Sequence, residues 1–419
     1  MINRRSFLQQ SLAVVSLGIG VPSVFSKAVA AAAEEKASAS VAGKTLIVVQ
    51  MAGGVDGLNT VIPYTNAAYH AGRSALAVPE ADMLIVDDRI AFHPSLAALK
   101  SEYDAGNLAV IEGVGYPQPN LSHFKSMDIW HAADPRGRGA GYGWIGRLAD
   151  TAYAGSTDPS LVVHVGDRVP YALHAAVHRP IAFTAPQAYR WIGAKSEVDA
   201  LESAGALCEG MDEGAAGATG PHRGRDSALA RMRRVLIEAQ RSSEKVREAA
   251  ASYRPQAVYP NNPLAGSLAT VAALLAGGLG TRIYSVETGG YDTHQGQKNR
   301  HDGLMATLGA SLGAFWKDLR AQKLDERVTL VAFSEFGRRV KENASGGTDH
   351  GVAGPMFVIG SSVKGGLYGK HPSLTELDRG DLIHTTDFRR VYSTVIDRWI
   401  GGDHRDALGK KWEALGFMA

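Results

Sequence analysis

The feature that most constrains the fold is a series of short β-branched runs, each closed by a turn and followed by acids or histidines. The first spans Lys44 to Met51 (KTLIVVQM) and ends at Ala-Gly-Gly. A run that is apolar at nearly every position is typical of a parallel strand buried on both faces. We therefore predict a central strand here, with ligand-binding residues just beyond its end.

Further apolar runs recur along the chain, with helical patterns between them. Strands alternating with helices predict an α/β fold, a mostly parallel sheet flanked by helices. The weakly patterned region from about 152 to 260 is predicted to be an inserted cap. The other predicted strands are 108–116 and runs near Val163, Tyr284, Val331 and Phe357, and the predicted helices are 94–105, 226–251 and about 304–322.

The N-terminus carries the pattern of an export signal. Arg4 and Arg5 precede Ser-Phe-Leu and a weakly apolar stretch that is too short to be a stable membrane span. Paired arginines of this kind indicate the twin-arginine translocase as a partner, and an ordinary secretory leader is the alternative. We predict a signal peptide over 1–33, a linker over 34–43, and a single exported domain over 44–419, periplasmic or secreted.

Composition limits the partners of this domain. The 419 residues are 45% hydrophobic and 21% charged, with a net charge of +2, as in a soluble globular protein. No long basic run suggests binding to nucleic acid, so a small-molecule ester or a glycan-linked substrate stays open. The single cysteine, Cys208, cannot form an internal disulfide.

Polar residues after the first two strands are candidates for chemistry. Asp56 follows the first strand and offers a carboxylate, although an Asp-Gly turn can be purely structural. Ser122 follows the second strand and could attack a substrate or cap the next helix. His123 or Lys125 beside it could hold an anionic group.

Three later loops combine carboxylates with histidines. Carboxylate and imidazole together suit zinc or manganese better than calcium or magnesium, although Asp292 could merely orient His294. A guanidinium suits an oxyanion. The candidate metal ligands are Asp292, His294, Glu335, Asp349 and His350, and the candidate oxyanion group is Arg338.

The segments GGVDGLN, YPQPNLSHFKSMDIWH, GGYDTHQ, FSEFGRR and GGTDHG, together with the leader, resemble a bacterial twin-arginine exported family catalogued as domain of unknown function 1501. That family is similar to the alkaline phosphatase and sulfatase superfamily, which places two metal ions and a nucleophile at strand ends. The resemblance implies an alkaline phosphatase-like fold. It also implies the nucleophile position for Ser122 and metal positions for Asp56, Asp292, His294, Glu335 and His350.

The sequence departs from the superfamily pattern in informative places. Phe336 stands where a histidine is expected after Glu335, and no Cys-x-Pro-x-Arg signature is present, which disfavours a formylglycine sulfatase. Asn120 is a second candidate for the nucleophile position. Two hypotheses follow: a metal-dependent hydrolase of phosphate or sulfate esters, or a non-catalytic envelope binding or scaffold protein on the same fold.

Overall fold

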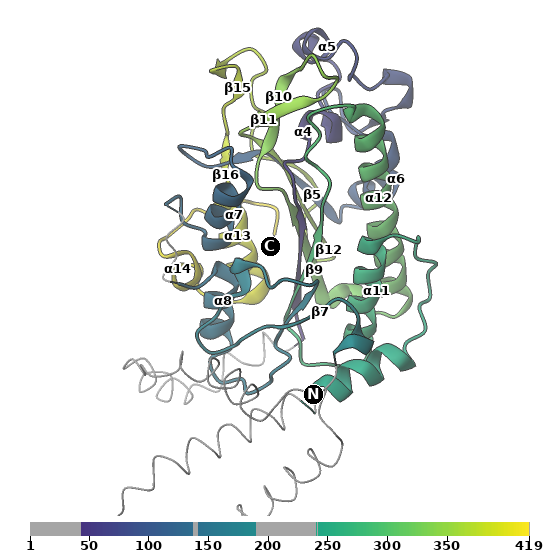
Figure 1. Ribbon diagram of the computed structural model, residues 1–419, viewed down its shortest axis with the longest axis vertical. Coiled ribbons are helices and arrows are strands. Elements are labelled where there is room, and N and C mark those ends of the chain that lie inside the picture. Colours follow the sequence, from purple (N-terminus) through teal and green to yellow (C-terminus); the bar gives the residue numbers. More distant parts are fainter. Residues whose placement is uncertain (1–42, 137–140, 190–239, 241, 419) are drawn as a thin grey trace, which may run out of the picture.

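The computed structural model describes residues 43–136, 141–189, 240 and 242–418. The predicted signal peptide, Cys208 and most of the predicted helix at 226–251 lie outside these residues. The centre is a nine-stranded sheet in the order β13-β5-β12-β9-β1-β8-β6-β7, with β16 beside β5 (Figure 1). Its strands are β1 (Thr45–Met51), β5 (Leu108–Gly115), β6 (Val162–Val165), β7 (Ile181–Phe183), β8 (Ile283–Thr288), β9 (Val328–Phe333), β12 (Gly354–Gly360), β13 (Gly366–Tyr368) and β16 (Thr386–Asp387).

Strand β1 is central, as its sequence predicts. It pairs in parallel with β8 on one side and β9 on the other, and each of its residues is buried. Ile47 and Val49 belong to the hydrophobic core on one face of the sheet, whereas Leu46 and Val48 belong to the core on the other face. Burial on both faces explains why the run is almost continuously apolar.

Helices cover both faces of the sheet, which confirms the predicted α/β class with a mostly parallel sheet (Figure 1). One layer contains α6, α11 and α12, and the other contains α7, α8, α13 and α14. The helices are α4 (Gly57–Thr60), α5 (Ala67–Gly72), α6 (Ala97–Asp104), α7 (His123–Ala132), α8 (Trp144–Ala152), α11 (Pro263–Ala276), α12 (Gln297–Ala321), α13 (Phe388–Val395) and α14 (His404–Leu408).

Strand β12 runs antiparallel to both β9 and β5, which departs from a purely parallel sheet. Its direction follows from the connection that precedes it. After β9 the chain forms the antiparallel ribbon β10 (Gly337–Glu342) and β11 (Thr348–Gly351), which projects past the sheet edge (Figure 1). Because this connection contains no crossover helix, the chain re-enters the sheet in the opposite direction.

The predicted cap over 152–260 contains part of the sheet itself. Strands β6 and β7 lie in this region, pair in parallel with each other, and extend the sheet beyond β8. Residues 242–252 are helical, and 190–239 lie outside the described residues. Small sheets outside the centre are formed by β2 (Val61–Ile62), β3 (Leu84–Ile85) and β4 (Ala91–Phe92), and by β14 (Leu377–Asp378) and β15 (Asp381–Leu382).

Two helices differ from the sequence prediction. Helix α12 begins at Gln297, before the predicted start near 304. Its first turns were missed because they are polar and show little apolar periodicity. Helix α11 was not predicted, since it is rich in alanine and leucine on nearly all sides. Among the helices that the structure describes, none has the length and apolar character needed to cross a membrane.

Candidate metal centre

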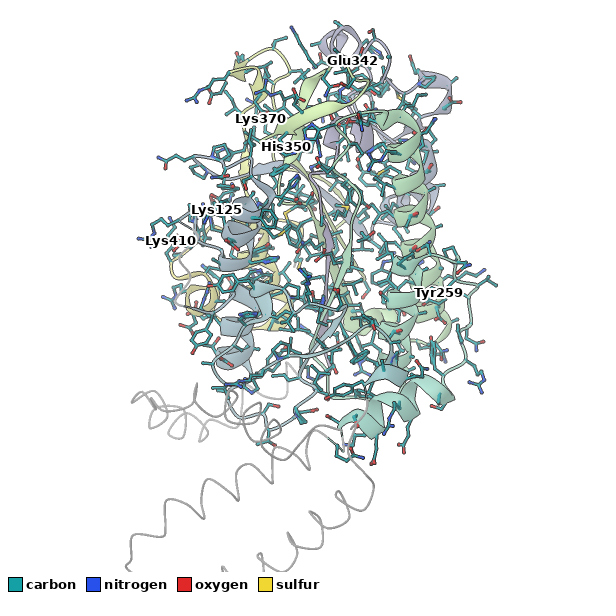
Figure 2. All side chains as sticks on the ribbon, in the orientation of Figure 1. Lys125, Tyr259, Glu342, His350, Lys370 and Lys410 are labelled. Carbon is teal, nitrogen blue, oxygen red and sulfur yellow. The ribbon has the colours of Figure 1, made fainter. Side chains whose placement is uncertain are left out.

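The predicted polar motifs meet at one edge of the sheet, where the parallel strands β5, β9, β1 and β8 have their carboxyl ends. His123 begins α7, which follows β5, and Asp292 and His294 lie in the loop after β8. His350 comes from β11, in the ribbon that projects over this edge (Figure 2). Four side chains from three separate segments of the chain therefore form one group, which we call the His–Asp cluster.

A tight glycine turn after β1 makes room for the cluster. Gly53 and Gly54 have φ values of 124° and 74°, in the left-handed region that favours glycine. A Cβ on Gly53 would collide with the backbone of Asp292, and one on Gly54 would collide with the ring of Phe336. The glycines that follow β1 thus let two later loops approach its end.

The imidazoles of the cluster direct their Nε2 atoms at Asp292. Its Oδ1 lies 3.2 Å from Nε2 of both His294 and His350, and its Oδ2 lies 3.6 Å from Nε2 of His123. The Nε2 atoms of His294 and His350 are 2.9 Å apart. Ligand atoms of His123, Asp292 and His350 all lie within 4.8 Å of one another, as the ligands of a metal ion would.

Oxygen atoms on the opposite side of each ring fix its orientation. Nδ1 of His123 lies 2.8 Å from Oε1 of Glu335, and Nδ1 of His350 lies 2.8 Å from the carbonyl oxygen of Leu121. Nδ1 of His294 faces Oδ1 of Asp349 at 3.5 Å. A ring proton on Nδ1, directed at these oxygens, would leave the lone pair of a neutral ring on Nε2 for a metal ion; without the ion, Nε2 of His350 can instead donate to Asp292. Metal-binding histidines are commonly held in this way.

The electrostatics of the cluster favour a cation at its centre. Burial alone would raise the pKa of Asp292, but hydrogen bonds from Arg338 and His350 outweigh it and lower the pKa to about 2. Partial burial lowers the pKa of His350, whereas the hydrogen bond to Glu335 raises the pKa of His123. Nε2 of His123 is buried and has no hydrogen-bond partner among the described residues.

Arg338 does not face an oxyanion, contrary to the sequence prediction. Its side chain is 0% exposed and donates to Oδ1 of Asp292 at 2.7 Å. The remaining hydrogen bonds go to backbone carbonyls, those of Gly54 at 2.8 Å and Thr348 at 2.9 Å among them. Because its donors are used inside the protein, Arg338 orients Asp292 and ties the turn after β1 to the ribbon.

Two predicted ligands contact the cluster through histidines. Oε1 of Glu335 accepts hydrogen bonds from His123 and from the backbone N–H of Gly53. Asp349 is exposed and faces His294. Phe336, which stands where the resemblance led us to expect a histidine, packs its ring against those of His123 and His350, with centroids 4.9 and 4.7 Å apart.

Asp56 lies outside the cluster in a closed network of its own. Its side chain is 0% exposed and forms an ion pair with the equally buried Arg73 at 2.5 Å. Gln297 also donates to Asp56, and Oε1 of Gln297 accepts from the hydroxyls of Thr293 at 3.0 Å and Thr348 at 2.6 Å. Asp56 is therefore connected to the loops that carry the cluster, but its charge is balanced by Arg73.

The nucleophile candidates lie at the start of α7, beside the cluster. Ser122 is exposed and occupies the N-cap position, but its side chain makes no capping hydrogen bond. Oδ1 of Asn120 accepts from the backbone N–H of Ser122 at 2.9 Å, so Asn120 shapes the turn that presents Ser122. Lys125 is exposed on the first turn of α7 (Figure 2).

Sequence reasoning assigned His123 to anion binding and did not place it among the metal ligands. The departure at Phe336 could have indicated this role for His123, because a site that lacks an expected imidazole can take one from a neighbouring loop. His123 is the histidine of the serine motif, and α7 points it at Asp292. The structure thus brings Asp292, His294 and His350 together and adds His123, and their role as metal ligands stays a prediction.

Comparison with known proteins gives one sequence family. The model of the family described as "Protein of unknown function (DUF1501)" matches residues 43–410. No curated protein sequence matches the chain.

Several solved structures are distantly similar in fold. The PsFucS1 sulfatase from Pseudoalteromonas sp. is 9% identical with a TM-score of 0.39, over 91% of this chain and 72% of that chain. The zinc complex of the C-terminal periplasmic domain of EcEptC from Escherichia coli is 11% identical with a TM-score of 0.35, over 76% and 73%. A protein in the alkaline phosphatase superfamily from Vibrio parahaemolyticus is 8% identical with a TM-score of 0.35, over 88% and 70%.

Proposed function

The chain belongs to the DUF1501 family, as its motifs predict, and we propose that it is an exported, metal-dependent hydrolase of phosphate or sulfate esters. The observation that carries this proposal is the inward orientation of the His–Asp cluster. The Nε2 atoms of three imidazoles lie 3.2 to 3.6 Å from the carboxylate oxygens of Asp292, and an oxygen faces Nδ1 of each ring. With the ring protons on Nδ1, these Nε2 atoms and the carboxylate together would ligate a cation.

The donor set fits zinc or manganese. Three imidazole nitrogens and one carboxylate oxygen are ligands that these metals accept, whereas calcium and magnesium prefer oxygen alone. Tetrahedral ligands at about 2.0 to 2.1 Å from zinc would stand about 3.3 Å apart. His294, His350 and Asp292 already show separations of 2.9 and 3.2 Å. Bound there, a metal ion would polarise the ester and stabilise a developing oxyanion.

The chain itself supplies groups for an anionic ester. The N-terminus of α7, with its free backbone N–H groups and partial positive charge, opens beside the cluster, and Lys125 adds a cation on its first turn. Ser122 stands at the same helix end with its hydroxyl free of a cap. These positions suit a substrate whose phosphoryl or sulfuryl group lies between α7 and the cluster.

We assign Ser122 as the attacking group. Its Oγ forms a bond to phosphorus or sulfur while the bond to the alcohol oxygen breaks. The hydroxyl proton passes to solvent, to which Ser122 is exposed, and the alcohol leaves with a proton taken from solvent. Water then cleaves the serine ester and restores the hydroxyl. Asn120, which accepts from the backbone of Ser122, would position the nucleophile.

Metal analysis of the purified folded protein tests the centre. Protein from cells grown with zinc and manganese should carry one of these metals, and His123→Ala and His350→Ala should each lose most of it. Ser122→Ala is the matched control and should keep its metal, because the proposed ligands are the imidazoles and the carboxylate of the cluster and do not include Ser122. A metal-free parent with unchanged histidine variants would remove the metallohydrolase proposal.

Activity separates the two hypotheses for the fold. Hydrolysis of 4-nitrophenyl phosphate or 4-nitrophenyl sulfate should occur in the metal-loaded parent and be lost in Ser122→Ala. Metal binding without hydrolysis of either ester would favour the non-catalytic binding or scaffold role. Hydrolysis that survives Ser122→Ala would replace serine attack by direct attack of water.

We also propose export through the twin-arginine translocase to the periplasm. The support is the Arg4-Arg5 pair ahead of Ser-Phe-Leu in the first residues of the chain. Replacing both arginines by lysine should leave the protein in the cytoplasm, as measured by fractionation with an antibody to the mature domain. Full export of this variant would assign the leader to the general secretory route instead.

A further inference from the structure

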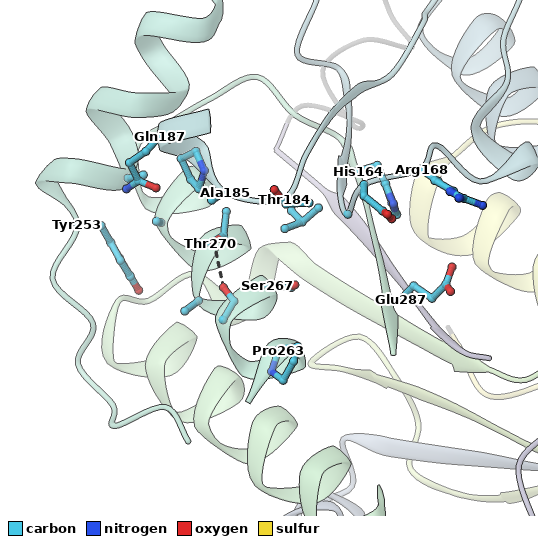
Figure 3. Close-up of a pocket in the computed structure, with 18 of the residues that line it drawn as sticks. His164, Arg168, Thr184, Ala185, Gln187, Tyr253, Pro263, Ser267, Thr270 and Glu287 are labelled. Carbon is cyan, nitrogen blue, oxygen red and sulfur yellow. Dashed lines mark hydrogen bonds between the residues drawn. The ribbon is translucent and has the colours of Figure 1, made fainter. Parts of the chain in front are cut away.

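A large cavity lies beside the His–Asp cluster, at the carboxyl ends of β6, β7 and β8 (Figure 3). Its volume is about 870 Å³, within the range of ligand sites in proteins. Helix α11 forms the wall opposite the strand ends, where Gly266 and Thr270 line the cavity. Ligands bind at such strand ends in open α/β sheets.

Three charged residues of the cavity lining have no side-chain partner among the described residues, whereas the hydroxyls of Tyr253 and Thr270 donate to Asp318 and to the carbonyl of Gly266. Within the described part of the chain, no side-chain hydrogen bond or ion pair joins Asp167, Arg168 or Glu287 to another residue. His164 also lines the cavity, is 1% exposed, and has a buried Nδ1 without a partner among the described residues. A buried polar atom without a partner indicates a ligand or water that completes it.

The cavity and the cluster share one strand. Glu287 and Gly289 line the cavity at the end of β8, and Asp292 follows in the same loop. Desolvation raises the pKa of Glu287, and the negative charges of Glu335 and Asp167 act in the same direction. The strand that lines one end of the cavity thus leads directly into the loop that carries Asp292 and His294.

The lining indicates the chemical class of the ligand. Among the described residues that line the cavity, Tyr253 is the one side chain among Phe, Tyr and Trp, and Val165 is the one branched aliphatic residue. The site therefore offers little stacking for a nucleobase. Two carboxyl groups against one guanidinium also disfavour a polyanion. Hydroxyl-rich ligands suit such a mixture of carboxyl, guanidinium, imidazole and hydroxyl groups.

We propose that this cavity binds the carbohydrate part of the substrate, with Asp167, Arg168 and Glu287 as hydrogen-bonding partners of its hydroxyl groups. That the carbohydrate is the alcohol part of an ester rests on the proposed function. The phosphoryl or sulfuryl group would then lie at the cluster and the sugar between the strand ends and α11.

A cavity-filling variant tests the site with a matched control. A Cβ on Gly266 meets no atom within 4 Å, so the side chain of Gly266→Trp can enter the cavity without a clash at its base. Gly303 in α12 has the same free Cβ position and lies outside the cavity, which makes Gly303→Trp the control. The probes are the neutral disaccharides maltose, cellobiose, lactose and chitobiose, and their binding is measured by saturation-transfer NMR and by titration.

At least one disaccharide should bind the parent and Gly303→Trp with equal affinity, and at least tenfold more weakly to Gly266→Trp. Glu287→Ala, which removes one hydrogen-bonding partner without filling the space, should lower the affinity for the same disaccharide. This second variant keeps the test valid if Gly266→Trp fails to fold. Absence of binding by all four disaccharides, or equal binding by Gly266→Trp and Glu287→Ala, would overturn the proposal.

Metal removal separates this inference from the proposed function. The cavity residues are not members of the cluster, so the protein stripped with a chelator and the His350→Ala variant should bind the disaccharide like the parent. Sugar binding without ester hydrolysis would retain the cavity as a carbohydrate site and reject the hydrolase. Hydrolysis of 4-nitrophenyl esters without sugar binding would reject the cavity site alone.

Discussion

Two aspartate–arginine pairs lie at the same sheet edge, and they differ in what surrounds them. In the pair of Asp56 with Arg73, both side chains are 0% exposed. In the pair of Asp292 with Arg338, the arginine is 0% exposed but the aspartate is 48% exposed. The first pair is closed by Gln297, whereas the second opens toward three imidazoles.

This difference separates a structural carboxylate from a chemical one. Asp56 is matched by a cation and an amide inside the protein, both on Oδ2, and its Oδ1 is buried without a hydrogen-bond partner among the described residues. Asp292 receives one hydrogen bond from Arg338 on Oδ1, which also faces His294 and His350, while its Oδ2 faces His123. A buried arginine can therefore orient a carboxylate proposed to bind a metal, provided that part of the carboxylate stays open to other groups.

The largest expected effect comes from breaking the closed pair. Arg73→Met leaves Asp56 as an unpaired charge in the interior, and such a change costs about 3 to 5 kcal/mol. Urea unfolding of the metal-free protein measures the loss. Asp292→Asn, the matching change in the open pair, should cost far less because Asp292 is half exposed, although it should abolish metal binding.

Equal destabilisation by Arg73→Met and Asp292→Asn in the metal-free protein would contradict the distinction between a closed and an open pair. Metal loss in Arg73→Met beyond that explained by unfolding would bring Asp56 back as a candidate ligand.

The pH dependence of stability gives the next largest effect and reports on the closed region. Burial lowers the pKa of His301, which lies near Asp56, to about 4. Unfolded histidine has a pKa of about 6.5, so between pH 4 and 6.5 the unfolded chain holds a proton that the native protein lacks. The free energy of unfolding should therefore rise with pH across this window, by about 1.4 kcal/mol per pH unit for this group.

Urea unfolding at intervals from pH 4.5 to 6.5 measures this slope. His301→Asn should reduce it by about 1.4 kcal/mol per pH unit, because the titrating group is removed. Thr60→Val is the control: its hydroxyl lies 3.5 Å from Nε2 of His301, so its loss should lower stability at every pH and leave the slope unchanged. An unaltered slope in His301→Asn would show that the region around Asp56 is open to water.

Much of the sheet could be predicted because buried parallel strands have an unmistakable composition. The runs that became β1, β5, β8 and β9 are apolar at most positions and end in turns. The ribbon β10–β11 was not predicted as strands, since its sequence is polar and its pairing is set by Arg338 and the turn after β1. Strand direction in β12 depended on that ribbon.

The motifs of the site could be predicted from the sequence, but not which carboxylate is structural and which faces the imidazoles. Position after a strand marks Asp56 and Asp292 alike, and sequence does not show that Arg73 and Gln297 close the first of them. Arg73 is the C-cap residue of α5 and does not belong to any of the motifs that follow the strands. Likewise, the orientation of His123 depends on Glu335, a residue of another loop.

A smaller effect is expected at the link between the two regions. Gln297→Met removes the donor to Asp56 and the acceptor for Thr293 and Thr348, and unsatisfied buried groups of this kind cost about 1 to 3 kcal/mol. Thr293 lies between the proposed ligands Asp292 and His294, so the metal affinity should also fall, by about 10- to 100-fold. Unfolding and competition with a chromogenic chelator measure the two effects.

Gln295→Met makes the same chemical change on an exposed residue of the same loop and is the control. It should leave both stability and metal affinity at parental values. If Gln297→Met lowers stability while the metal affinity stays constant, the two regions are independent and Gln297 only supports the fold.

The smallest effect concerns the exposed hydroxyl at the open region. An N-cap serine that bonds to its helix loses about 0.5 to 2 kcal/mol on replacement by alanine. Ser122 makes no such bond, so Ser122→Ala should change the free energy of unfolding by close to zero. Asn262→Ala is the comparison, because Oδ1 of Asn262 caps α11 by accepting from Ala265 N–H at 2.8 Å, and it should show the full loss. A loss near 1 kcal/mol in Ser122→Ala would mean that the hydroxyl caps α7 in solution, and the case for Ser122 as the nucleophile would weaken accordingly.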